Sequence, residues 1–258
     1  MITIDVNPIA FTIGTVSVAW YGIMIALAVL TLVLWTLREV RRGASIPYRR
    51  VIYLALIGVP SGIFFARLVH VIDLWDYYSQ HLDQIIGISG LAIYGAVFGA
   101  VLVMWIYSRV RKFSFGYLAD IITPGMLLGQ AVGRVGCTLN GCCYGEETWG
   151  FTAVIYSHPG SFAPIGVPIH PTQIYEMIFL LIVFAVLLRF RGRFKPDGSL
   201  FLIYLSLYSL WRFGLGFIRD GTPFLFGLHE AQVIALIVLA IAVTILALKT
   251  RWVKKEVR

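Results

Sequence analysis

Long apolar runs separated by short polar segments dominate the chain. Seven runs are long enough to cross a bilayer as helices, since about 20 residues span about 30 Å of hydrocarbon. They lie at residues 18–37, 51–72, 88–108, 117–139, 172–190, 199–218 and 230–248. Lipid cannot hydrogen-bond exposed backbone groups, so each run is expected to be helical. The pattern predicts an all-α membrane protein with seven transmembrane helices.

Composition favours a single bundle embedded in lipid. Of the 258 residues, 59% are hydrophobic and 13% are charged, whereas soluble domains are about half apolar and about a quarter charged. We therefore expect one integral membrane domain over residues 1–258. The segment 140–171 contains four prolines and is expected to form the longest outer loop.

The formal charge of +8 is explained by where the basic residues stand. Of the 21 lysines and arginines, 17 fall between runs one and two, three and four, or five and six, or after run seven. In a seven-helix bundle these segments share one side, which the positive-inside rule makes cytoplasmic. The N-terminus is then outside and the C-terminus cytoplasmic, and the charge indicates no nucleic-acid partner.

Four arginines are left inside a run or at its outer end, namely Arg67, Arg134, Arg212 and Arg219. A charge in hydrocarbon costs on the order of several kcal/mol, so it normally marks a cavity or a function. The nearest acids are Glu176 and Asp220, and the group is expected to be short of anions. The planar guanidinium suits phosphate, so we expect it to bind an outer-leaflet phospholipid. Any one of the four could instead snorkel or brace helices.

The sixth run strengthens the phosphate interpretation. Tyr208, Arg212, Gly216 and Arg219 follow one another at spacings of 4, 4 and 3, which places them on one helical face. Gly216 is expected to let a ligand approach the backbone between two guanidinium groups.

Five motifs occur in order along the chain. They are WYGIMIALAVL (20–30), GISGLAIYGAVFGA (87–100), GQAVGRVGCTLNGCCYG (129–145), IHPTQIYE (169–176) and YLSLYSLWRFGLGFIRD (204–220). With them the chain resembles the bacterial prolipoprotein diacylglyceryl transferase family over nearly its whole length.

The resemblance implies a transferase that catalyses the first step of lipoprotein modification. The diacylglyceryl group of phosphatidylglycerol moves to the thiol of a lipobox cysteine in an exported preprotein, and glycerol 1-phosphate is released. The implied partners are phosphatidylglycerol, lipobox-containing preprotein signal peptides and membrane lipids, with no cofactor. The implied location is the bacterial plasma (inner) membrane, with the active site facing the outer leaflet.

The resemblance also implies roles for individual residues. Arg134 and Arg212 correspond to the family's principal substrate-binding arginines, and Arg67 and Arg219 are weaker candidates for the same field. Other functional family positions are matched by Tyr21, Asn140, Gly145 and Tyr208. The chain departs from the family pattern at Tyr94, where a histidine is usual, at Cys137 and Cys142, where Asn and Glu are usual, and at Gly216, where Glu is usual.

The thiol must lose its proton, because the thiolate is the nucleophile. Tyr94 is one candidate base, and it could instead orient the phosphate as a hydroxyl donor. His170 is a second candidate base, with a structural hydrogen bond at the start of the fifth helix as the alternative. Gln173 and Glu176 share a helical face and are expected mainly to orient an arginine.

Three cysteines, Cys137, Cys142 and Cys143, leave several interpretations open. Cys137 and Cys142 could form a disulfide, or act as small packing residues. No metal site is expected, because a four-ligand site lacks partners. Two other functions remain possible: a phospholipid-binding or transport protein of the same family without transfer activity, and a thiol-redox enzyme built on the three cysteines.

Overall fold

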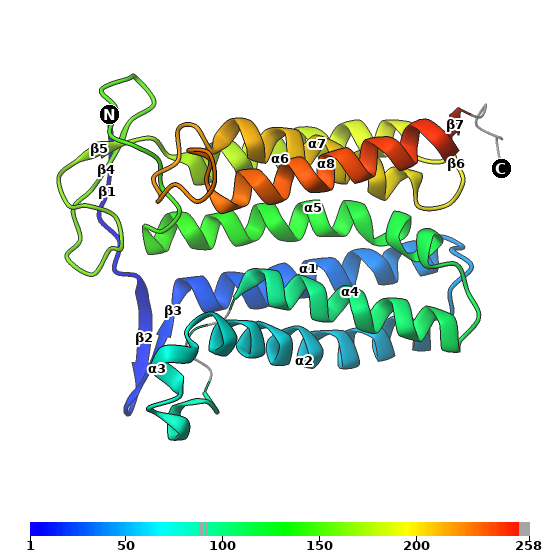
Figure 1. Ribbon diagram of the computed structural model, residues 1–258, viewed down its shortest axis with the longest axis horizontal. Coiled ribbons are helices and arrows are strands. Elements are labelled where there is room, and N and C mark those ends of the chain that lie inside the picture. The colour runs from blue at the N-terminus through cyan, green and yellow to red at the C-terminus, as the bar shows by residue number, and fades with distance from the viewer. Residues whose placement is uncertain (88–89, 91, 253–258) are drawn as a thin grey trace. The chain divides into compact units, whose positions relative to one another are not determined.

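The computed structural model describes residues 1–87, 90 and 92–252 (Figure 1). Its long helices are α1 (Trp20–Arg41), α2 (Tyr48–Asp73), α4 (Ile93–Val110), α5 (Phe115–Asn140), α6 (Thr172–Phe190), α7 (Ser199–Leu215) and α8 (Glu230–Lys249). Each predicted run overlaps one of these helices, with ends that differ by a few residues. Residues 88, 89 and 91 of the third run and motif, and Lys254, Lys255 and Arg258 near the C-terminus, lie outside the described residues.

Short strands accompany the helices, so a purely helical fold is too simple an expectation. They are β1 (Ile2–Ile4), β2 (Ile9–Ile13), β3 (Val16–Ala19), β4 (Val154–Tyr156), β5 (Pro168–Ile169), β6 (Phe194–Lys195) and β7 (Arg251–Trp252). Two short helical turns, α3 (Trp75–Tyr78) and η1 (Leu82–Gln84), lie between α2 and α4. All of these elements fall outside the long helices, where backbone groups need other partners.

Five of the long helices, α1, α2, α4, α6 and α8, have the length and apolar composition to cross a membrane. Helix α7 is apolar but shorter, with 17 residues. Helix α5 is not among the five although it has 26 residues. It carries Asp120, Gln130 and Arg134, which make it less apolar than its neighbours. Polar residues, among them the candidate functional residue Arg134, thus lower the apolar character of α5.

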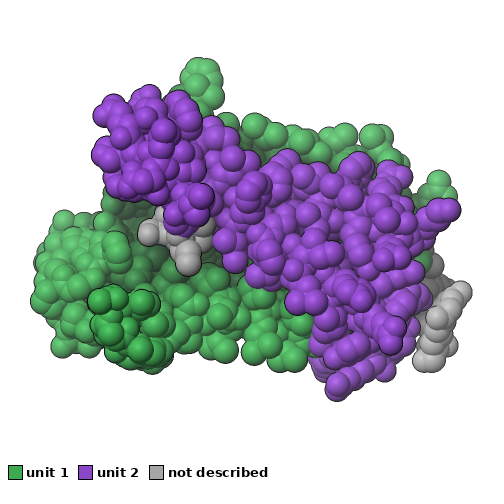
Figure 2. All heavy atoms as spheres, turned by 90° about the horizontal axis from the view of Figure 1, so that it is seen from below, with its two compact units in different colours: residues 1–36, 119–258 green, residues 37–118 purple. Residues whose placement is uncertain are grey.

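The chain divides into two compact units, which Figure 2 shows in green and purple. Unit 1 comprises residues 1–36 and 119–258, and unit 2 comprises residues 37–118. Unit 1 therefore contains most of α1 and α5 together with α6, α7 and α8. Unit 2 contains α2 and α4.

The core of unit 1 lies between α5, α6 and α7 (Figure 1). Large apolar side chains fill it: Leu127, Ala131, Leu180, Val183, Leu187, Leu200 and Tyr204. Asp120 of α5 fixes the start of α7, because its carboxylate accepts hydrogen bonds from the backbone N–H of Gly198 at 2.8 Å and of Phe201 at 2.9 Å. A carboxylate at a helix N-terminus satisfies unpaired N–H groups there. Asp120 is therefore structural, at the far end of α5 from Arg134.

Helix α1 approaches α5 closely because α5 presents glycines to it. A Cβ on Gly129 would lie 2.8 Å from the carbonyl oxygen of Ala28, and one on Gly136 would lie 2.8 Å from Cβ of Met24. Small residues permit this backbone approach between helices. The same contact brings Tyr21, near the start of α1, beside the last turns of α5.

The segment 140–171 is ordered by a three-stranded sheet in the order β1-β4-β5. β1 pairs in parallel with β4, with Ile2 opposite Val154 and Ile4 opposite Tyr156. The phenol of Tyr156 is buried and donates a hydrogen bond to the carbonyl oxygen of Thr138 at 2.9 Å. The sheet is therefore tied to the end of α5.

In unit 2, α4 packs against α2 through small residues. The Ser61 hydroxyl donates a hydrogen bond to the Gly99 carbonyl oxygen at 3.1 Å. A Cβ on Gly99 would lie 2.7 Å from Cβ of Phe65. The small residues of the GAVFG segment (95–99) thus serve packing within the chain.

Candidate active site

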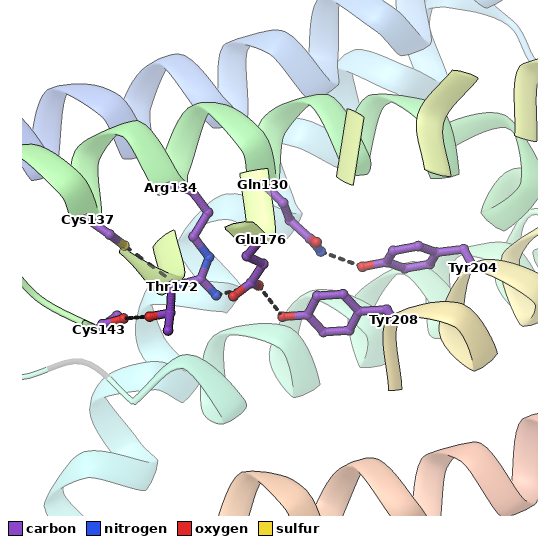
Figure 3. A network of polar contacts seen from close by, with 8 residues as sticks. All are labelled: Gln130, Arg134, Cys137, Cys143, Thr172, Glu176, Tyr204 and Tyr208. Atoms are coloured by element: carbon purple, nitrogen blue, oxygen red, sulfur yellow. Dashed lines mark hydrogen bonds and ion pairs between the residues drawn. The ribbon is translucent and has the colours of Figure 1, made fainter. Parts of the chain in front are cut away.

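A buried carboxylate connects three helices of unit 1 at the centre of the candidate site. Glu176 of α6 accepts hydrogen bonds at Oε1 from Nη2 of Arg134 on α5, at 2.6 Å, and from the phenol of Tyr208 on α7, at 2.9 Å (Figure 3). The Glu176 side chain is 2% exposed and that of Arg134 is 19% exposed. Arg134 is thus held in place by a buried ion pair with Glu176, while the three other arginines of the group still outnumber the nearby acids.

A second polar pair lies beside this network. The side-chain amide of Gln130 donates a hydrogen bond to the phenol of Tyr204, one helical turn before Tyr208 (Figure 3). Gln130 and Tyr204 were not among the expected site residues. A signal was available, because Gln130 is a polar residue in an apolar run, four residues before Arg134.

The loop after α5 turns back sharply and is clamped by the start of α6. Gly141 and Cys143 have φ values of +71° and +64°. The Thr172 hydroxyl donates a hydrogen bond to the Cys143 carbonyl oxygen at 2.5 Å, and the Gln173 amide donates to the Cys142 carbonyl oxygen at 2.7 Å. Gln173 therefore holds this loop, whereas the expected role was to orient an arginine. Thr172 was not among the expected site residues, although it belongs to the HPTQ motif.

Gly145 lies where three motifs meet. Its N–H donates a hydrogen bond to the carbonyl oxygen of His170 at 2.9 Å, and it forms an antiparallel bridge with Arg219. A Cβ at this position would lie 2.8 Å from Cβ of His170 and would also collide with the carbonyl oxygen of Ile218. Only glycine fits, so the residue brings the ends of α5, α6 and α7 together.

Two expectations about α7 need correction. The helix ends at Leu215, so Arg219 is not on the helical face of Tyr208 and Arg212 but in the following segment. The space in front of Gly216 is filled by the side chain of Gln232 from α8. Gly216 therefore serves helix packing and does not admit a ligand.

Arg212 keeps a donor available. Its Nη1 is buried and has no hydrogen-bond partner among the described residues. The positive charges of Arg219 and Arg134 act on it, as does the negative charge of Glu176. Three guanidinium groups thus gather near one carboxylate, an arrangement that attracts a further anion.

Asn140 and Tyr21 stand at the same end of the fold. Asn140 is the last residue of α5, where its side chain reaches the Cys142 thiol and its carbonyl oxygen accepts a hydrogen bond from Phe162 N–H at 3.2 Å. Tyr21 is 39% exposed in the first turn of α1.

His170 is linked through Tyr175 to Thr152 in the segment 140–171. Its Nδ1 lies 3.2 Å from the Tyr175 hydroxyl, which in turn lies 2.6 Å from the Thr152 hydroxyl. These contacts link the start of α6 to the loop, and they favour the structural alternative for His170 over the role of base.

Two candidates belong to unit 2. Arg67 of α2 donates hydrogen bonds to the carbonyl oxygens of Gln84, Ile85 and Gly90, and its guanidinium lies 5.0 Å from the ring centre of Tyr78. This favours the bracing alternative for Arg67. Tyr94 is 44% exposed in the first turn of α4.

The three cysteines are free thiols, and their Sγ atoms all lie within 4.8 Å of one another. Nη1 of Arg134 lies 3.8 Å from Sγ of Cys137 (Figure 3). Hydrogen bonds from the thiols of Cys137 and Cys142 lower the pKa of the Cys143 thiol, and the charges of Arg219 and Arg134 act in the same direction. The cysteines therefore form one cluster beside Arg134.

Comparison with known proteins gives a consistent picture. The family model described as prolipoprotein diacylglyceryl transferase matches residues 8–248. A phosphatidylglycerol–prolipoprotein diacylglyceryl transferase of Dehalococcoides mccartyi is 52% identical over 243 residues, which cover 94% of this chain and 94% of the relative. Proteins of the same name from Clostridioides difficile and Listeria monocytogenes are 36% and 34% identical, covering 89% and 93% of this chain and 90% and 88% of the relatives.

Proposed function

The chain belongs to the prolipoprotein diacylglyceryl transferase family, and on this premise we propose that it moves the diacylglyceryl group of phosphatidylglycerol onto a preprotein cysteine. The products are a thioether-linked lipid on the preprotein and glycerol 1-phosphate. Relatives that are 50% and 52% identical over 97% and 94% of the chain carry the name of this activity. They do not favour the alternative of a phospholipid-binding protein without transfer chemistry.

The reaction is a displacement at carbon. The preprotein sulfur forms a bond to the terminal glycerol carbon of the diacylglyceryl group, and the bond from that carbon to the phosphate oxygen breaks. The electron pair of the broken bond stays on the departing phosphate, and a base takes the thiol proton. The site must therefore stabilise charge that gathers on a phosphate monoester.

The arrangement of Arg134, Glu176 and Arg212 is the observation that carries the proposal. Glu176 fixes one guanidinium by an ion pair of 2.6 Å, while Arg212 keeps a buried donor that has no partner in the described part of the chain. A phosphate placed between the two would use that donor and neutralise the surplus positive charge. Donors fixed before the reaction stabilise the transition state without the cost of reorganisation.

Other residues act around this pair in the proposal. Tyr208 holds Glu176 and thereby the orientation of Arg134. Arg219 adds charge, and Tyr21, Asn140 and Gly145 border the headgroup at the ends of α1 and α5. Gln173 positions the loop that follows α5.

The base is proposed to be Tyr94, with His170 as the second candidate. Replacing Tyr94 by Phe removes the hydroxyl and keeps the ring. Turnover that stays unchanged in this variant would remove Tyr94 from the mechanism.

We also propose the arrangement in the membrane. All seven long helices span it as one domain over residues 1–258, with the N-terminus outside and the C-terminus cytoplasmic. Basic residues occupy the last turns of α1, α4, α6 and α8, and alternating helices place these four ends on one side, which the positive-inside rule makes cytoplasmic. The site then faces the outer leaflet of the bacterial inner membrane, where segment 140–171 meets the lipobox of an exported preprotein.

The function is tested with the purified protein, phosphatidylglycerol labelled in its headgroup and a lipobox peptide. Release of labelled glycerol phosphate that depends on the peptide, and that is lost in Arg134→Ala and Arg212→Ala, is the expected result. Arg189→Ala is the matched control, because Arg189 lies in the last turn of α6, at the opposite end from Glu176. Folded protein that binds the lipid but releases nothing would instead support the binding alternative.

A further inference from the structure

The cysteine cluster is not used by the transfer reaction. Cys137 comes from the last turn of α5, and Cys142 and Cys143 come from the turn that follows it. Three sulfur atoms approach one common point, with every Sγ within 4.8 Å of the other two. A disulfide uses two sulfurs, whereas a bound cation can use all three.

The loop is held in this shape at a cost. Cys143 adopts φ +64°, a left-handed backbone conformation that a residue with a side chain rarely adopts. Thr172 and Gln173 offset this by holding the carbonyl oxygens of Cys143 and Cys142. The cluster is therefore preorganised by the start of α6.

The spacing of the sulfurs matches coordination by thiolates. Thiolates that bind a d¹⁰ cation at about 2.3 Å stand about 3.8 Å apart in a tetrahedral arrangement, so shifts of about 1 Å would suffice here. Among the described Cys, His, Asp and Glu residues, the cluster consists of the three cysteines. Structural zinc takes four ligands, whereas soft thiolate ligands also select Cu⁺. With no fourth ligand of these types among the described residues, the three sulfurs favour Cu⁺ over a structural Zn²⁺.

The surroundings suit the charge of such a complex. Three thiolates around Cu⁺ carry a net charge of −2, and the guanidinium groups of Arg134 and Arg219 act on the cluster. Nη1 of Arg134 is 3.8 Å from Sγ of Cys137, the contact that a thiolate would strengthen. Cys137 is buried and the other two cysteines are half-buried, which shields the sulfurs from bulk water.

We propose that Cys137, Cys142 and Cys143 form a binding site for one Cu⁺ ion, and that its occupation inhibits the enzyme through Arg134. Binding forms three Cu–S bonds and releases the three thiol protons to solvent, with no change of oxidation state. The thiolates then draw the Arg134 guanidinium away from the phosphate. The inhibition rests on the proposed function, whereas the binding does not.

The binding is measured on the reduced full-length protein in detergent, without oxygen, by titration with Cu⁺ against a chromophoric Cu⁺ chelator. One ion per chain is expected, with an ultraviolet thiolate-to-copper absorption band. Cys137→Ser, Cys142→Ser and Cys143→Ser should each weaken binding at least tenfold. Met104→Leu is the matched control, because it removes a sulfur on α4 that is not part of the cluster.

X-ray absorption at the copper edge of the wild-type complex gives a second measurement that does not depend on how the variants fold. Three sulfur neighbours are expected. Two sulfurs, or a mixture of nitrogen and oxygen, would overturn the assignment. So would copper binding that survives replacement of all three cysteines by serine.

Two further outcomes decide between this proposal and its rivals. A chain that loses two thiols and 2 Da in air, and that takes up no Cu⁺ when reduced, would overturn the proposal in favour of a disulfide. Preferential uptake of Zn²⁺ over Cu⁺ would overturn the identity of the ion. In the transfer assay, Cu⁺ at one ion per chain should slow transfer by the wild type at least tenfold and should not change the rate of Cys137→Ser. Copper binding remains measurable even if the protein has no transfer activity.

Discussion

Arg67 and Arg134 are both arginines within long helices, yet their surroundings differ. Each of the three nitrogens of the Arg67 guanidinium group donates to a backbone carbonyl oxygen in residues 84–90. Arg134 contacts a buried carboxylate through Nη2 and a thiol through Nη1. The first guanidinium has its nitrogens committed to the main chain, while the second is oriented and keeps donor capacity. The comparison teaches that the use of donors, more than charge, separates a bracing arginine from a binding one.

The largest effect is expected when the proposed phosphate-binding arginines, Arg134 and Arg212, are removed. Arg134→Ala and Arg212→Ala should each lower kcat about 10²- to 10³-fold, as loss of one preorganised donor to a developing anion does elsewhere. The measurement is the initial rate of glycerol phosphate release at saturating phosphatidylglycerol. Rates within threefold of wild type in both variants would show that the two residues do not bind the leaving phosphate.

Arg67→Ala should lower stability and leave the transfer rate nearly unchanged. Hydrogen bonds from a charged donor contribute about 1.5–3 kcal/mol, so we expect thermal unfolding in detergent at a lower temperature, with a loss of about 2 kcal/mol. Transfer by the folded variant should change less than threefold. Unchanged stability with a collapse of transfer would instead place Arg67 in the phosphate field.

Glu176→Gln tests whether the charge of the carboxylate is needed to orient Arg134. The amide keeps an oxygen for Arg134 and Tyr208 but loses the charge, and a charge-assisted hydrogen bond is about twice as strong as a neutral one. We expect kcat to fall about tenfold while lipid binding persists. Glu230→Gln is the control, because it changes an acid in the first turn of α8. Equal rates for the two variants would count against orientation by Glu176.

The smallest effect concerns the packing of α2 on α4. Gly99→Ala would place a methyl group 2.7 Å from Cβ of Phe65, so about 1 kcal/mol of stability should be lost. Gly58→Ala, with nothing within 4 Å, should be neutral or slightly stabilising because alanine favours helix. Thermal unfolding of the two variants measures the difference, and a reversed order would contradict the packing described for unit 2.

The helices were predictable because lipid imposes long apolar runs, and the arginine group was predictable because charge is costly in such runs. The side chains that these residues contact were not predictable from the sequence. Glu176 was expected to orient an arginine, but that this arginine is Arg134 follows only once α5 and α6 pack side by side. The place of Arg219 depends on α7 ending at Leu215, and that of Gly216 on Gln232, 16 positions further along the chain. Short strands such as β1 and β4 carry too few residues for a periodic signal.

The pairing of β1 with β4 has a consequence for biosynthesis. Val154, the partner of Ile2, is made 152 residues later in the chain. At about 5–20 residues per second, β1 waits roughly 8 to 30 seconds without its neighbour. Its exposed backbone edge is then open to wrong pairing. Closing this sheet is therefore a late step of assembly, which must follow insertion of the helices between the two strands.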